Sequence, residues 1–147
     1  MIFLVVIGFF VFDSLIIITA LWFFFKMMGR MVASSAFPRL YEIWPALTRP
    51  PGKTFSRQYI ALNEVWYKNA ANLVIADEGL YLSFGFPVSL SISQAVLIPW
   101  EYLRYQEKRR AFWTDTYVYQ ILLDSPVLLT VMKGVARSFP EHLQPVG

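Results

Sequence analysis

The sequence predicts one N-terminal transmembrane α-helix followed by a small, mainly β domain with about seven antiparallel strands and a C-terminal helix. Two observations support this fold class. Residues 2–25 form an apolar run whose only charge is Asp13. From Phe55 onward, short β-rich runs alternate with turn residues. The roughly 120 residues after the apolar run suffice for one compact domain.

The apolar run is long enough to cross a bilayer. As a helix it measures about 36 Å, and a hydrocarbon layer is about 30 Å thick. It lacks a basic leading region and exceeds the length of a signal-peptide core, so an uncleaved anchor is favoured over a signal peptide. We assign residues 1–34 to the anchor and its juxtamembrane extension. Trp22, Lys26 and Arg30 are expected at the membrane interface, where aromatic rings and cations meet headgroups.

The charge distribution predicts the orientation of the anchor. No basic residue precedes the apolar run, and only Glu42 opposes the cations that follow it as far as residue 57. These cations are Lys26, Arg30, Arg39, Arg49, Lys53 and Arg57. The positive-inside rule then places the N-terminus outside and the domain in the cytoplasm.

Residues 35–53 are expected to form a short amphipathic helix and a proline-rich linker. Ser34 or Ser35 is the expected N-cap. Apolar side chains then recur at helical spacing, at Phe37, Leu40, Tyr41, Trp44 and Leu47. Two interpretations stay open: the helix lies on the membrane, with Trp44 at the interface, or it packs on the domain. Pro50-Pro51-Gly52 ends this segment, so the β domain is expected over residues 54–147.

Seven runs in the domain are predicted as strands, at residues 55–65, 72–76, 80–84, 95–98, 102–107, 117–123 and 127–132. Asp77-Glu78-Gly79 and Asp124-Ser125-Pro126 are expected to be hairpin connections, the first with positive φ at Gly79. Residues 133–143 are expected to form the final helix, with Val135 and Phe139 on one face.

Three motifs carry a resemblance to a known family. They are Asp77-Glu78-Gly79-Leu80-Tyr81-Leu82-Ser83, Phe86-Pro87 and Leu97-Ile98-Pro99-Trp100-Glu101. Together they resemble a pattern in uncharacterised bacterial membrane-anchored proteins with a pleckstrin-homology-like (PH-like) domain. The resemblance covers roughly residues 55–143, although residues 88–94 depart from the proline-rich segment common there. It implies two nearly orthogonal sheets closed at one corner by a helix, and it implies no catalytic residues.

The composition leaves few routes to catalysis. The chain has no cysteine and a single histidine, His142, which is expected to be a solvated surface residue. Thiolate chemistry, sulfur-ligated metals and Ser-His-Asp catalysis are thereby excluded or disfavoured. Trp100-Glu101 beside Tyr102 is expected to belong to the core rather than to an active site. We therefore expect no enzyme activity and no cofactor.

Asp13 is the leading candidate for a functional residue. A carboxylate at mid-bilayer costs on the order of 3 kcal/mol, so such residues normally face a partner, a cavity or a proton path. Ser14 and Gly8 are expected to help a partner helix approach, because small and hydroxylated residues permit close helix packing. The alternative is that Asp13 carries protons.

Lys108-Arg109-Arg110, followed by Ala111-Phe112-Trp113, is the second candidate site. It is expected in the link between the fifth and sixth strands, where cations beside aromatic rings suit an anionic bilayer surface. The competing interpretation, which we favour, is a solvated turn whose aromatic residues fold back into the core. Nucleic-acid binding is not expected, because three cations are too few for a basic stripe.

These observations favour a non-enzymatic accessory subunit in the bacterial inner membrane. Its expected partners are a larger integral membrane protein or complex and the lipid bilayer, and homo-oligomers stay possible. The alternatives are a module that responds to anionic lipids through Lys108, Arg109 and Arg110, and a proton-pathway subunit that uses Asp13.

Overall fold

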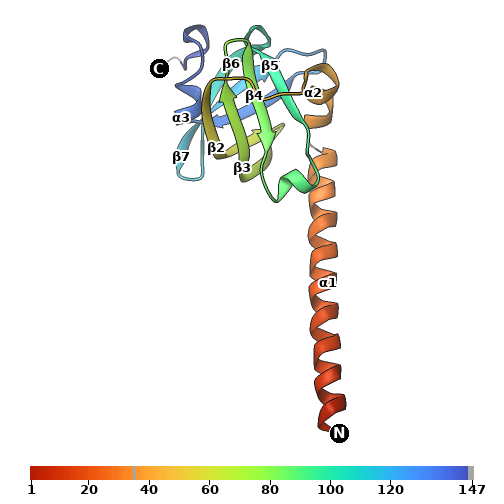
Figure 1. The fold of residues 1–147 in the computed structure, drawn as a ribbon. Coiled ribbons are helices and arrows are strands. Elements are labelled where there is room, and N and C mark those ends of the chain that lie inside the picture. Colours follow the sequence, from red (N-terminus) through yellow and green to blue (C-terminus); the bar gives the residue numbers. More distant parts are fainter. Residues whose placement is uncertain (35, 146–147) are drawn as a thin grey trace.

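A single long helix precedes the domain. The computed structural model describes residues 1–34 and 36–145, with the side chains of residues 28–34 left out. Helix α1 covers Ile2–Ser34 and runs away from the domain as a straight rod (Figure 1). Within it, Ile2–Met27 is long and apolar enough to cross a membrane, and its side chains are exposed. The predicted anchor therefore has the length, composition and exposure of a membrane span.

The domain is built on one antiparallel sheet of eight strands. The strands are β1 (Pro45–Ala46), β2 (Lys53–Leu62), β3 (Val65–Ile75), β4 (Gly79–Phe84), β5 (Ala95–Pro99), β6 (Leu103–Ala111), β7 (Thr114–Ile121) and β8 (Val127–Met132). Their order is β1-β5-β4-β3-β2-β8-β7-β6. Strand β2 thus joins one meander, β2 to β5, to a second one, β6 to β8. The predicted class, an apolar helix followed by an antiparallel domain, is confirmed. The PH-like assignment stays a prediction.

The first hairpin differs from its prediction. The run at residues 55–65 contains most of strand β2 and then a two-residue turn, Asn63-Glu64, with φ values of 48° and 69°. Strand β3 consequently begins at Val65 and not at residue 72. Asparagine is favoured at such a left-handed hairpin position. Asn63 also bonds Leu128 of β8 twice: its N–H donates to the Leu128 carbonyl at 2.8 Å, and its Oδ1 accepts from the Leu128 N–H at 2.9 Å.

Gly79 is required for a reason other than the predicted one. Its φ is not positive. Instead, strand β4 runs so close to β5 that a Cβ at Gly79 would lie 2.1 Å from the carbonyl oxygen of Ile98. The glycine thus permits a close backbone approach, which is its other common use.

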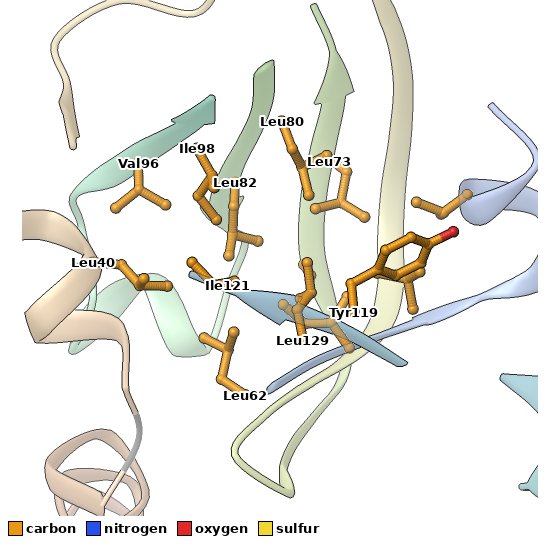
Figure 2. Close-up of a cluster of buried hydrophobic side chains, with 14 of the residues drawn as sticks. Leu40, Leu62, Leu73, Leu80, Leu82, Val96, Ile98, Tyr119, Ile121 and Leu129 are labelled. Atoms are coloured by element: carbon orange, nitrogen blue, oxygen red, sulfur yellow. The ribbon is translucent and has the colours of Figure 1, made fainter. Parts of the chain in front are cut away.

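Helix α2 (Phe37–Ile43) packs into the domain. Its N-cap is Ala36, which makes no side-chain capping bond, so the predicted serine cap is wrong. Phe37 and Leu40 are buried in the domain core, where Phe37 lies edge-on against Phe84 with ring centroids 5.3 Å apart. Figure 2 shows Leu40 in the same buried cluster as Val96 and Ile121. A segment expected to precede the domain therefore contributes to its core.

The C-terminal segment closes the other end of the core. The expected helix over residues 133–143 is reduced to α3 (Lys133–Ala136) and a 3-10 turn, η3 (Glu141–Leu143). Val135 and Phe139, which were predicted to share one helix face, are both buried. The Phe139 ring lies 4.9 Å from that of Tyr119 and 5.2 Å from that of Trp100. This contact places Trp100 in the core, and its Nε1–H donates to the Ala76 carbonyl at 2.8 Å.

Candidate membrane and partner sites

Asp13 lies close to the middle of the candidate span, Ile2–Met27. Its side chain is exposed, and no hydrogen bond or ion pair reaches it from the residues that the structure describes. In water such a carboxylate needs no explanation. At mid-bilayer it needs a hydrogen-bonding group, a countercharge or a proton, because hydrocarbon offers none of them. The described residues supply no hydrogen-bonding group or countercharge to Asp13, so inside a bilayer another molecule or a bound proton would have to do so.

Helical geometry separates Asp13 from the two residues predicted to act with it. At 3.6 residues per turn, Gly8 points about 140° away from Asp13 and Ser14 about 100° away. Ser14 Oγ instead donates to the Phe10 carbonyl at 2.8 Å. Ala20 and Phe24, by contrast, lie within about 20° of the direction of Asp13. We call Asp13, Ala20 and Phe24 the Asp13 stripe.

The interfacial end of α1 combines aromatic rings with a cation. Lys26 Nζ lies 4.7 Å from the ring centroid of the exposed Trp22. The pair suits the headgroup layer, where a cation and an amphipathic ring are both stable. Arg30 falls among the residues whose side chains are not described. Trp44, the other predicted interface residue, belongs to the domain: it is half-buried and its ring lies 5.1 Å from that of Tyr102.

An apolar cleft of about 490 Å³ lies between this end of α1 and the domain. Phe24 and Met27 line it from the helix, and β3 and the β4–β5 connection line it from the domain. The domain residues are Trp66, Lys68, Ala70, Pro87 and Val88. One residue of the Asp13 stripe, Phe24, therefore faces the domain.

The three consecutive cations lie on a strand and not in a loop. Lys108, Arg109 and Arg110 all belong to β6, which continues to Ala111, so the predicted loop position is wrong. Successive residues of a strand point to opposite faces. Arg109 pairs with Glu107 and, at 3.3 Å, with Glu64. Lys108 is the cross-strand neighbour of Tyr117 on β7. Lys108 and Arg109 therefore point to opposite faces of the sheet.

The turn after these cations is Phe112-Trp113, and its two rings behave differently. Phe112 folds back on the sheet: its ring lies 5.4 Å from that of Tyr59 and 4.8 Å from that of Trp66. Lys68 Nζ lies 5.2 Å from its centroid. Trp113 is 95% exposed. The expectation of a solvated turn with both rings folded back thus holds for Phe112 alone.

The remaining candidates are His142 and the buried Tyr119, both in the C-terminal part of the chain. His142 is exposed on η3, as expected. Among the residues that the structure describes, no three His, Asp or Glu side chains lie together in a way that would hold a metal ion. Burial raises the pKa of Tyr119, and the neighbouring Tyr105 and Tyr117 add to the effect. Its hydroxyl donates to the Leu143 carbonyl at 2.8 Å, so this tyrosine serves the core.

No family model, curated protein or solved structure matches this chain. Two features of the sites were missed from the sequence. The Phe112-Trp113 turn contains neither glycine nor asparagine, which are the usual signals of a tight hairpin. The cleft is lined by residues of α1, β3 and the β4–β5 connection. Segments so far apart in the chain cannot be placed together from a local sequence pattern.

Proposed function

We propose that this protein is a non-enzymatic, single-pass accessory subunit of a bacterial inner-membrane complex. The observation that carries the proposal is Asp13, exposed near the middle of the span without a partner among the described residues. A helix that keeps an unpaired carboxylate at this depth is suited to meet a second membrane protein. The contact would involve a cationic or hydroxyl group on a helix of that protein.

The Asp13 stripe supports a specific line of contact. Asp13, Ala20 and Phe24 face one direction along α1, and Phe24 also lines the cleft beside the domain. A partner helix that follows the stripe would emerge from the membrane next to Trp66 and Lys68. The anchor and the domain would then both contact the same partner. This arrangement gives each part of the chain a role in one assembly.

Strand β6 offers the domain a further docking element. It is the last strand of the sheet order and pairs with β7 alone among the described strands. Edge strands can pair with a strand of another protein, and charged side chains restrict which partner is accepted. The cations Arg104, Lys108 and Arg110 on β6 favour an acidic partner segment.

Two substitutions of Asp13 test the proposal. Asp13→Asn keeps a hydrogen-bonding group, so complex formation should largely persist. Asp13→Leu removes the polar contact, which is worth about 0.6 to 2 kcal/mol in membranes, and should weaken co-purification of the partner. Ser14→Ala is the matched control, because Ser14 points away from the stripe and bonds its own helix.

The proton-pathway alternative gives a different pattern. A proton carrier needs a titratable group, so Asp13→Asn would assemble normally but abolish transport as completely as Asp13→Leu. Full assembly with lost activity in Asp13→Asn would therefore contradict the accessory role of Asp13. Unchanged co-purification in Asp13→Leu would contradict the partner contact itself.

A further inference from the structure

We propose that the β6–β7 turn inserts Trp113 into the interfacial layer of the bilayer that α1 crosses. The domain would then rest on the membrane in a fixed orientation instead of hanging freely from its anchor. This inference goes beyond the accessory role and holds whichever group Asp13 meets.

The backbone of the turn is the first observation. Phe112 and Trp113 form a two-residue loop between the paired residues Ala111 and Thr114, with φ values of 50° and 64°. Asn-Gly is the favoured sequence for such a loop, and bulky residues are strained in it. The ring of Phe112 packs on Tyr59 and Trp66, so its position has a role inside the domain. Trp113 has the same strained backbone without an aromatic or cation contact of its own among the described residues.

The chemistry of Trp113 is the second observation. A tryptophan that is 95% exposed to water leaves a large apolar ring unburied. Its indole N–H makes tryptophan suited to the membrane interface, where the ring meets acyl chains and the N–H meets headgroups or water. A strained, fully exposed tryptophan is therefore explained by a membrane surface within its reach.

The position of the turn relative to α1 is the third observation. Phe24 and Met27 line one cleft with Trp66 and Lys68, and both of these domain residues contact Phe112. The turn therefore packs against two residues that face the interfacial end of the anchor across this cleft. A helix of 26 residues measures about 39 Å, so with about 30 Å in hydrocarbon its last turns lie among headgroups. Figure 1 shows the β6–β7 turn at the end of the domain from which α1 runs.

A second connection at the same end has similar chemistry. The β4–β5 connection contributes Pro87 and Val88 to the cleft beside α1. Its Phe86 is 77% exposed and its Leu90 is 58% exposed. Lys68 lines the same cleft as Met27 and adds a cation that suits lipid phosphates. Apolar tips combined with a cation are complementary to a phospholipid surface.

The absence of cysteine makes a direct test simple. The full chain carrying Trp113→Cys is spin-labelled in nanodiscs of phosphatidylcholine with phosphatidylglycerol. Collision rates with oxygen, which concentrates in lipid, and with a water-soluble nickel chelate are then measured. Glu78→Cys is the matched control, because Glu78 lies exposed in the turn at the other end of β3.

Insertion predicts a several-fold higher ratio of oxygen to nickel collisions at position 113 than at position 78. Equal ratios at the two positions would overturn the proposal. A label at 113 that is shielded from both agents would also overturn it, since that result indicates contact with protein. Leu90→Cys provides a second site away from the strained turn: a lipid-like ratio there supports the docked orientation, and a water-like ratio contradicts it.

Discussion

The phenolic hydroxyl of Tyr119 donates a 2.8 Å hydrogen bond to the backbone carbonyl of Leu143. Tyr119 lies on β7, and Leu143 ends the last described 3-10 turn. Both side chains are buried, and the ring of Phe139 packs against that of Tyr119. This bond therefore helps to fasten the C-terminal segment over one end of the core, together with the buried Phe139 and Leu143.

We predict that Tyr119→Phe destabilises the domain by about 1–2 kcal/mol, because the Leu143 carbonyl loses its donor while the packed ring is kept. Urea unfolding of the full chain in detergent, followed by far-ultraviolet circular dichroism, measures the change. Tyr81→Phe is the control, since Tyr81 is only half-buried. Equal midpoints for Tyr119→Phe and the parent would contradict the prediction.

The same tyrosine predicts a loss of stability at high pH. Burial raises the pKa of Tyr119 above its ordinary value of 10.0. The unfolded chain therefore releases this proton at lower pH than the folded chain does, and stability falls as the pH rises above about 10. The contribution is fully present below that pH. Unfolding measured from pH 8 to pH 11 should show a smaller decline in Tyr119→Phe than in the parent.

Helix α2 is predicted to be required for the fold of the domain. Phe37 and Leu40 are buried, and large-to-small changes at such sites cost about 2–5 kcal/mol. A fragment of residues 36–147 should melt cooperatively, whereas one of residues 53–147 should not. Leu40→Ala should lower stability by a similar 2–5 kcal/mol. Leu47→Ala is its control, because Leu47 is 95% exposed, and a cooperative melt of residues 53–147 would refute the requirement.

Gly79→Ala is predicted to be strongly destabilising, on the order of 2–4 kcal/mol, because the new Cβ would force β4 away from the Ile98 carbonyl. Gly134→Ala is the matched control. A Cβ at Gly134 would meet no atom within 4 Å, and alanine in α3 should be neutral or slightly stabilising. Thermal unfolding of both variants decides the point, and similar midpoints would show that the sheet adjusts freely.

The orientation of the anchor is predicted from its flanking charge. Six basic residues follow the apolar run before β3, and none precedes it. A C-terminal alkaline phosphatase fusion should therefore be inactive and a C-terminal fluorescent-protein fusion bright, as for a cytoplasmic domain. The opposite pair of results would reverse the topology.

The sequence predicted the elements whose signals are local. The apolar run, the β-rich pattern and the shared apolar face of Val135 and Phe139 were all recognisable from composition and spacing. The failures have a common physical cause. The Asn63-Glu64 turn was hidden inside a β-rich run, and the Phe112-Trp113 turn carries no turn residue, so strands β3 and β6 were predicted too short. The burial of Phe37 depends on Phe84, which is 47 residues away in the chain, and periodicity cannot indicate which surface an amphipathic helix meets.

The shared strand β2 also governs when the domain can be completed during synthesis. Strand β2 is made early, yet its pairing with β8 joins Ala61 to Thr130, and the Asn63 turn bonds Leu128, 65 residues later. Such distant pairings form late because a long loop must close first. Every residue as far as β8 must leave the ribosome before the second meander can pair with β2, whereas α1 emerges earlier and can enter the bilayer. The domain is therefore expected to close while already tethered, with the membrane as the surface beside which it folds.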